Sequence, residues 1–454
     1  MTELAAKCIR EEPRFRGLIK FKNQIEMSSP TMYGDELEYI KQAFQSNQIS
    51  VVGENIDRLE ETIAKYAGVQ NVVALSCGTA AVHLAVKLAA ERIYGSGGIS
   101  TINGIGVGGS LFGKRVFCQD LSCAATVNPI IYEGGEPVFI DASADDWNME
   151  PEALEIGFEQ YPDVKIVICS HLNGFPGQIE TIKGICEKHG ALLIEDASES
   201  LGAKYKEKPV GSFGDYGVFS FSGNKIITAG SGGALLTNDS DSAFKARKWS
   251  AQSCEAALWN QYEELGYNYQ MSNVIAGVAL GQWKRLEECI AKKKRIYDHY
   301  ADSLKTLGAE LNPFDADTLE PSYWISCMRL DENSICAATR SEYSYTYRNV
   351  HGRTCPMEML EALEAFGVES RMIWKPMHLQ PMYRDYEFIS LDGGQWKTHR
   401  FGSQLLDRAD ESRSLFEQCL CLPSDIKMKA EEQERVVEII CACFCEQDFE
   451  RLDV

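Results

Sequence analysis

The first two thirds of the chain alternate short apolar stretches with helix-like stretches, and this alternation restricts the fold more than any other feature. Runs rich in Val, Ile and Leu predict strands at 71–76, 114–118, 137–141, 164–170, 191–196 and 233–238. Helical patterns lie between several of them, for example at 150–160 and 179–190. Strands that are apolar along their whole length and alternate with helices are typical of a mostly parallel sheet with both faces covered. We therefore predict a large α/β domain.

The pattern changes after a long helical stretch at 272–307, and the remainder of the chain is predicted to form a smaller α+β domain. A length of 454 residues is sufficient for two or three domains. We place an N-terminal arm at residues 1–34, the large domain at 35–285 and the small domain at 286–454. Residues 384–412 are polar and irregular and are predicted to form a loop.

The charge balance argues against several classes of partner. The chain has 45 Lys and Arg and 66 Asp and Glu, a net charge of −21, which does not suit nucleic acid or an anionic membrane surface. We see no apolar signal-peptide core and no uncharged apolar run of about 18 residues, so we expect no transmembrane helix. Sixteen irregularly spaced cysteines then favour free thiols in a reducing cytoplasm.

Two features that resemble binding motifs are interpreted as structural. Cys441, Cys443 and Cys445 lack a companion CxxC or HExxH, so we predict apolar packing in a helix and no metal site. A glycine-rich stretch at 95–113 contains GIGVGG, which has the GxGxxG spacing. The dinucleotide fingerprint follows a strand and opens a helix, whereas here a helix precedes the glycines and a strand follows. We interpret this stretch as a surface insertion.

Two predicted strands end in residues suited to ligand binding, and ligands collect at such ends in an open α/β sheet. In ALSCGTAAVH, Gly78, Thr79 and Ala80 begin a helix whose free N–H groups attract phosphate, although Thr79 could simply cap the helix. In ALLIEDASES, Asp196 ends an apolar strand, where a buried carboxylate needs a partner. That partner is either a helix that Asp196 caps or the protonated ring nitrogen of a cofactor.

A third stretch, FSFSGNKIITAGSGG, surrounds Lys225 with glycines and polar residues. Most lysines are surface cations, but a lysine in a desolvated site is an effective nucleophile toward aldehydes. Ser220 can donate to phosphate, and the glycines let the backbone turn around a planar group. A phosphate cradle, a buried carboxylate and a buried lysine, in this order, are what pyridoxal phosphate requires. We therefore predict this cofactor, with Lys225 forming the Schiff base and Asp196 keeping the ring nitrogen protonated.

With these motifs the chain resembles the sugar aminotransferases of the DegT/DnrJ/EryC1/StrS family, within the fold-type I pyridoxal phosphate enzymes. The likeness runs from about Ile25 to Phe444 and includes IEDASESLGA, FSFSGNKIITAGSGGALLTND, GYNYQMSNVIAG and IWKPMHLQP. The resemblance implies a fold-type I α/β transferase, with a large, mixed, mostly parallel sheet and a smaller C-terminal α+β domain. It is particularly similar to the branch that aminates 4-keto nucleotide sugars for polysaccharides and glycans.

The resemblance also assigns roles to single residues. Lys225 matches the Schiff-base lysine and Asp196 the partner of the ring nitrogen. Phosphate contacts are matched by Thr79, Ala80 and Ser220, and Glu199 sits where the family has Gln or Glu near the phenolic oxygen of the cofactor. Asn268 matches an asparagine that reaches the phosphate of the neighbouring subunit, which implies a homodimer with shared active sites.

Other positions bear on the substrate. His378 in IWKPMHLQP is expected either near the sugar or as a hydrogen-bonded structural histidine, and Trp374 is expected to pack in the small domain. Cys123 stands where relatives usually have an aromatic residue that stacks on the cofactor. The other departures are Gln48 for a usual Trp, Asn173 for a usual Tyr and Gln270 for a usual Arg. They would remove ring surface and one positive charge near the expected cleft.

The expected reaction moves an amino group from an amino acid, by analogy L-glutamate, to a keto nucleotide sugar, a UDP-linked 4-keto-6-deoxy hexose. Two alternatives remain open from the sequence. One is a pyridoxal phosphate-dependent sugar dehydratase of the same fold, although Lys225 argues against those dehydratases that replace the lysine by histidine. The other is a non-catalytic, cofactor-binding regulator, for which no helix-turn-helix or basic patch provides support.

Overall fold

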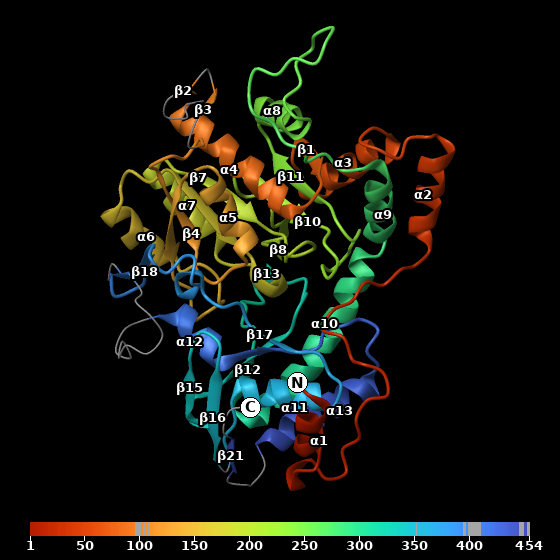
Figure 1. Cartoon of the computed structure of the whole chain (residues 1–454), viewed down its shortest axis with the longest axis vertical. Coiled ribbons are helices and arrows are strands. Elements are labelled where there is room, and N and C mark those ends of the chain that lie inside the picture. The colour runs from red at the N-terminus through yellow and green to blue at the C-terminus, as the bar shows by residue number, and fades with distance from the viewer. Residues whose placement is uncertain are drawn as a thin grey trace.

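A computed structural model describes residues 1–95, 101–102, 105–106, 109–350, 352–393, 396–397, 410–444 and 449–451. Figure 1 shows an upper part built around a large sheet and a lower part that contains both ends of the chain. The helix α10 (Leu286–Leu304) runs from the upper part into the lower one. The large sheet positions most of the residues that the sequence analysis selected, and the lower part closes over them.

The large sheet has nine strands in the order β1-β11-β10-β7-β6-β4-β5-β18-β19. Their bounds are β1 Asn71–Leu75, β4 Arg115–Gln119, β5 Glu136–Ile140, β6 Ile166–Ser170, β7 Leu192–Asp196, β10 Tyr216–Ser220, β11 Gly233–Thr237, β18 Glu387–Ile389 and β19 Trp396–Lys397. The six from β10 to β18 are parallel, whereas β11 is antiparallel to both of its neighbours. All six predicted strands are present within two residues at each end, and the predicted α/β fold is confirmed.

Helices cover both faces of this sheet, which explains why its strands are apolar without alternation. Alternate residues of one strand enter different cores: Cys118 of β4 packs in the cluster that contains α4 and α5, and Phe117 in the cluster that contains α6 and α7. The helices of this part are α2 Asp35–Gln45, α3 Glu54–Ala67, α4 Gly78–Tyr94, α5 Ala124–Tyr132, α6 Pro151–Gln160, α7 Ile179–His189, α8 Ser240–Ser250 and α9 Asn273–Trp283. The central helix α4 is buried along most of its length.

The lower part is built on a four-stranded antiparallel sheet in the order β12-β14-β20-β17. Its strands are β12 Ala309–Leu311, β14 Cys327–Leu330, β20 Cys419–Cys421 and β17 Arg371–Met372, and its helices besides α10 are α1 Glu3–Arg10, α11 Pro356–Ala365, α12 Glu411–Gln418 and α13 Ala430–Cys443. Short strands complete the fold: β2 Thr101–Ile102, β3 Ile105–Gly106, β8 Lys204–Tyr205, β9 Lys208–Pro209, β13 Leu319–Glu320, β15 Ala338–Arg340, β16 Tyr345–Asn349 and β21 Phe449–Arg451. The N-terminal segment belongs to this part, because Arg10 donates to the Ala365 carbonyl at 2.6 Å.

The prediction of a loop at 384–412 is wrong in part. Within that range β18 adds a parallel strand to β5 of the large sheet, with Phe388 opposite Phe139, and β19 pairs with β18. The chain beyond residue 286 therefore returns to the large sheet. The expected boundary at 286 assigns this returning segment to the small domain. A three-residue strand is too short for periodicity to reveal, and only its burial shows its role. Residues 394–395 and 398–409 lie outside the described part.

Several sequence features fall partly outside the described residues. Residues 96–100, 103–104 and 107–108 of the 95–113 insertion are among them, including Gly104, so its interpretation as a surface insertion stays a prediction. Cys445 is outside as well, whereas Cys441 and Cys443 lie in α13. Over the described residues, no group of three or more His, Cys, Asp and Glu is arranged to hold a metal ion. In the same residues, no helix is both long enough and apolar enough to cross a membrane.

Candidate active site

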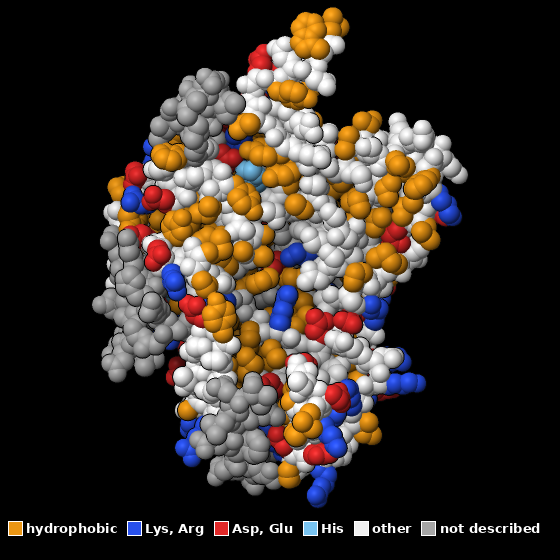
Figure 2. Space-filling view, viewed as in Figure 1, with side chains coloured by type: hydrophobic (Ala, Val, Ile, Leu, Met, Phe, Trp, Pro, Cys, Tyr) orange, Lys and Arg blue, Asp and Glu red, His pale blue; other side chains and the backbone are white. Residues whose placement is uncertain are grey.

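A cavity of about 240 Å³ lies at the carboxyl ends of β4, β6, β7 and β10, against the lower part of the molecule. Figure 2 shows a hollow between the two parts, in which Lys or Arg side chains are visible among hydrophobic ones. The lining residues are Gly78, Thr79, Val82, Ser122, Cys123, Ala125, Thr126, Ser170, Leu172, Asp196, Ser198, Glu199, Ser220, Ser222, Asn224, Lys225, Trp324, Arg371 and Trp374. The cavity is therefore where ligands of open α/β sheets bind.

The predicted site residues divide into two groups. Those that line the cavity are Gly78, Thr79, Cys123, Asp196, Glu199, Ser220 and Lys225. Ala80 is buried one position further into α4, and Asn268 is an exposed residue outside the lining. His378 is also outside the lining. The structure thus brings together the three stretches that the sequence analysis selected, and Cys123 joins them from the end of a fourth strand, β4.

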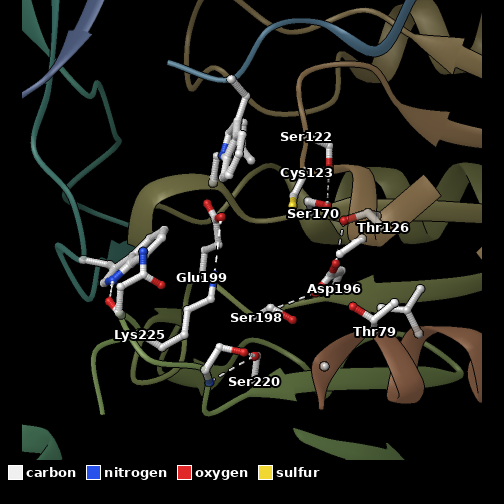
Figure 3. Close-up of a pocket in the computed structure, with 18 of the residues that line it drawn as sticks. Thr79, Ser122, Cys123, Thr126, Ser170, Asp196, Ser198, Glu199, Ser220 and Lys225 are labelled. Atoms are coloured by element: carbon white, nitrogen blue, oxygen red, sulfur yellow. Dashed lines mark hydrogen bonds and ion pairs between the residues drawn. The ribbon is translucent and has the colours of Figure 1, made fainter. Parts of the chain in front are cut away.

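Asp196 ends β7 with both carboxylate oxygens held by neutral donors (Figure 3). The Thr126 hydroxyl donates to Oδ2 at 2.7 Å, and the Ser198 backbone N–H donates to Oδ1 at 3.1 Å. Among the described residues no Lys, Arg or His forms an ion pair with this nearly buried carboxylate. A buried carboxylate without a cation is costly. The protonated ring nitrogen of pyridoxal phosphate would supply the missing positive charge, and in this respect the site fits the cofactor.

Lys225 extends into the cavity from the turn that follows β10 (Figure 3). Its Nζ lies 3.5 Å from Glu199 Oε1 and 4.2 Å from the ring centroid of Trp324, and its side chain is 14% exposed. The turn is fixed, because the Lys225 N–H donates to the Ser222 carbonyl at 3.1 Å. Glu199 is fixed as well, since its Oε2 accepts from the Asn173 N–H at 3.1 Å. The lysine amine is thus held in a sheltered position with a carboxylate beside it.

Hydroxyl groups surround the first turn of α4, on the side of the cavity nearest Ser220. Thr79, Ser198, Ser220 and Ser222 all line this region, and the side-chain cap of α4 is a weak acceptor, Cys77 Sγ, 3.4 Å from the Ala80 N–H. The N–H groups and the positive end of the helix dipole remain available to an anion. A phosphate group fits this set of donors.

Gly78 permits the close approach of α4 to Ser220 and Ser198 in this region. A Cβ at this position would lie 2.9 Å from Ser220 Cβ and 3.3 Å from Ser198 Oγ, so Gly78→Ala should push α4 away from the end of β10. We expect the affinity for pyridoxal phosphate to fall about tenfold, the loss of roughly one good hydrogen bond to an ion. Titration followed by absorbance measures it. Gly223→Ala is the matched control, because nothing lies within 4 Å of its Cβ position; equal affinities for both variants would contradict the prediction.

The lower part of the molecule supplies a wall that sequence reasoning missed. Arg371 begins β17, and Trp374 lies two residues after its end. The guanidinium carbon of Arg371 lies 5.2 Å from the Trp374 ring centroid and 5.8 Å from that of Trp324. Trp374, which was expected to pack in the small domain, packs against a hydrophobic core and in addition lines the cavity. The cavity therefore has two cations, Lys225 and Arg371, in a strongly acidic chain.

The four departures from the family pattern differ in their place. Only Cys123 lines the cavity, and burial raises the pKa of its thiol, which keeps it protonated and neutral. Asn173 contributes its backbone N–H to Glu199 rather than a ring to the wall. Gln48 and Gln270 are outside the lining; the Gln48 carbonyl accepts from the Asn273 side chain at 2.7 Å. Of the four positions, Cys123 is therefore the one that lines the cavity.

His378 lies in the fully buried interior beside the cavity region, and its ring nitrogens are both paired with carboxylates. Nδ1 is 2.6 Å from Asp120 Oδ2 and Nε2 is 3.2 Å from Asp410 Oδ2. The ring also stacks on Phe388 at 4.1 Å between centroids. This geometry agrees with the structural alternative for His378 and gives no support to a sugar contact.

The comparisons with known proteins agree with this geometry. The profile of the DegT/DnrJ/EryC1/StrS aminotransferase family matches residues 30–441. The putative pyridoxal phosphate-dependent aminotransferase EpsN of Bacillus subtilis is 34% identical over 93% of this chain and 96% of its own length. The GDP-perosamine synthase of Caulobacter vibrioides is 32% identical over 79% of this chain and 87% of its own.

The fold recurs in solved structures. The putative sugar aminotransferase Spr1654 of Streptococcus pneumoniae, in its pyridoxal phosphate form, superposes with a TM-score of 0.74 at 19% identity. The match covers 92% of this chain and 98% of that protein. With the family profile spanning nearly the whole sequence, the chain belongs to the DegT/DnrJ/EryC1/StrS aminotransferase family.

Proposed function

We propose that this protein is a pyridoxal phosphate-dependent aminotransferase that moves an amino group from an amino acid, by analogy L-glutamate, to a keto nucleotide sugar. The observation that carries the proposal is the placement of Lys225, Asp196 and the first turn of α4 around one cavity. When bound there, the cofactor supplies an aldehyde that bonds an amine and a ring that withdraws electrons from it.

The residues of the chain have separate roles in this proposal. The first turn of α4 and Ser220 would hold the phosphate, and Asp196, which accepts a hydrogen bond from Thr126, would pair with the ring nitrogen. Glu199 lies beside the Lys225 amine and orients it. With donor and cofactor bound, the Lys225 amine would act as general base and general acid, taking up and releasing a proton at Nζ. The two parts of the molecule shelter these groups in part, since the Lys225 side chain is 14% exposed.

Arg371 supports a donor that has a carboxylate. A guanidinium binds carboxylates through two parallel hydrogen bonds, and among the described residues no Asp or Glu forms an ion pair with Arg371. The rings of Trp374 and Trp324 lie near the guanidinium and help to fix its place in the cavity wall. An α-amino acid such as L-glutamate fits this arrangement, with its amino group toward Lys225.

The proposal includes a cytoplasmic homodimer with shared sites. Asn268, assigned by resemblance to the partner's phosphate, is exposed. It follows a segment that extends beyond α8 in Figure 1, where Leu258 is 98% exposed and Trp259 and Tyr262 are also exposed. An exposed apolar extension beside Asn268 is suited to contact with a second copy.

The proposed reaction is tested by mass spectrometry of the sugar product. The purified protein with pyridoxal phosphate and L-glutamate should convert a 4-keto-6-deoxy nucleotide sugar into an amino sugar and release 2-oxoglutarate. UDP- and GDP-linked acceptors are compared, because the family resemblance implies UDP and a relative is named for a GDP sugar. A product that lacks nitrogen would instead identify a dehydratase, and cofactor binding with no turnover on any acceptor would favour the regulator.

A further inference from the structure

A buried lysine outside the cavity lies beside the segment that carries Lys225. Lys293 is in the middle of α10 and only 3% of it is exposed. Within the described chain it forms no ion pair, and its ammonium donates to three neutral oxygens. Burial lowers the pKa of Lys293 to about 8, while Asp425 and the Cys289 thiol, the titratable groups that face it, act in the opposite direction. Burial of the Lys293 ammonium costs free energy, and at this position the charge is not available to solvent.

The three oxygens belong to segments that are far apart in the sequence. They are the Ser28 hydroxyl at 3.1 Å, the Trp324 carbonyl at 2.8 Å and the Ser424 carbonyl at 2.9 Å. An ammonium has three protons, so each proton has one acceptor. Lys293 thereby joins the N-terminal segment, the segment before β14 and the segment after β20 at one point.

Two of these partners continue to the turn that carries Lys225. The Ser28 hydroxyl donates to the Asn224 carbonyl at 3.2 Å, and the Trp324 indole N–H donates to the same carbonyl at 2.7 Å. Asn224 directly precedes Lys225. The Trp324 ring also lies against the Lys225 amine, with 4.2 Å between Nζ and the ring centroid. The hydrogen bonds from Lys293 thus reach both the backbone and the side chain of the Lys225 turn.

Stability alone does not explain Lys293. Its folded pKa of about 8 is below the ordinary value of 10.5, so between these values the folded protein binds fewer protons than the unfolded chain. The contribution of this group to stability therefore rises with pH across that window, and at pH 7 the buried ammonium is a cost. Methionine has a similar length and no charge, and we expect it to leave the fold intact.

We propose that Lys293 is a positioning residue for Lys225: its ammonium fixes Trp324 and the Asn224 carbonyl, and these fix the place of the Lys225 amine in the cavity. The inference rests on the proposed function in one respect, the assignment of Lys225 as the amine that bonds pyridoxal phosphate. Without Lys293 the three segments lose their common donor, and the Trp324 ring and the turn can shift against the cavity.

The test compares Lys293→Met with Lys294→Met. Lys294 is its neighbour on α10, half exposed and paired with Asp298 at 2.7 Å. Each protein is mixed with pyridoxal phosphate, reduced with borohydride at timed intervals and digested, and the pyridoxyl mark on Lys225 is measured by mass spectrometry. We expect Lys293→Met to take the mark about tenfold more slowly while it remains folded at the assay temperature. Lys294→Met should match the wild type.

Ser28→Ala provides a second variant should Lys293→Met fail to fold. It removes the hydroxyl between Lys293 and Asn224 without changing a buried charge, and we expect a few-fold slower marking. If Lys293→Met is folded, a wild-type rate of marking in that variant would overturn the inference. If it does not fold, a wild-type rate in Ser28→Ala would do so. Either result would leave the proposed function intact. Absence of a mark on wild-type Lys225 would instead overturn the proposed function, and the inference with it, so the two failures are distinguishable.

Discussion

Lys225→Ala is expected to lower turnover by about 10³-fold or more and to abolish covalent capture of pyridoxal phosphate. Lys225 is the one lysine among the described residues that line the cavity, so no neighbouring amine can replace it there. The amine has a defined place between Glu199 and the Trp324 ring, which a new side chain would not reproduce. Steady-state kinetics and borohydride reduction followed by peptide mass spectrometry measure the two effects.

Two further variants separate the chemistry of the amine from its charge. Lys225→Arg keeps a positive charge but no amine that bonds an aldehyde, and we expect it to be as inactive as Lys225→Ala. Lys204→Ala, which removes a surface lysine paired with Glu320 at 3.0 Å, should retain full activity. Added methylamine should restore part of the turnover of Lys225→Ala. Full aminotransfer by Lys225→Ala would refute the proposed mechanism.

The large sheet and its strand-end residues were predictable because both signals are local. Five-residue strands such as β6 and β7 are buried throughout, and a polar residue that directly follows such a run is visible in the sequence. Asp196 and Ser220 are each the last residue of a strand, and Lys225 follows a few residues later. Since parallel strands place their carboxyl ends at one edge, the order of these residues along the chain is enough to predict a shared site.

The contacts that complete the site were not predictable, because they depend on approach between distant segments. Thr126 belongs to an apolar helix and reaches Asp196 from 70 positions away. Arg371 comes from a two-residue strand, too short to show periodicity, and nothing local to Trp374 distinguishes a cavity wall from core packing. β18 was not predictable for the same reason, because its pairing with β5 depends on a segment that returns from the lower part of the molecule.

His378 helps to hold this returning segment against the large sheet. Its backbone N–H and Nδ1 both contact Asp120, which follows β4 of the large sheet, and its ring stacks on Phe388 of β18. Nε2 contacts Asp410, which precedes α12 in the lower part. One buried imidazolium between two carboxylates therefore connects the large sheet, its added strand and the lower part. Burial opposes the charge, but Asp120 and Asp410 outweigh it and raise the pKa of His378 to about 10.

His378→Gln is therefore expected to lower the free energy of unfolding by about 3–5 kcal/mol near pH 6, because it leaves the fully buried Asp120 carboxylate and the partly buried Asp410 carboxylate without their cation. Urea unfolding measures the change. His299→Gln is the matched control: His299 pairs with Glu434 at 3.1 Å on the surface, where such a pair is worth about 1 kcal/mol or less. Equal losses in the two variants would contradict the role given to His378.

The pH dependence distinguishes a charged contact from simple packing at the same position. The folded pKa of His378, about 10, is above its ordinary value of 6.5, so its stabilisation is fully present below about pH 6.5 and is lost as the pH rises toward 10. As the pH rises from 6.5 to 10, the free energy of unfolding should fall more steeply for the wild-type protein than for His378→Gln. The difference in free energy of unfolding between the two proteins should therefore narrow. Parallel curves would show that the imidazole acts through shape and stacking on Phe388 instead of through its charge.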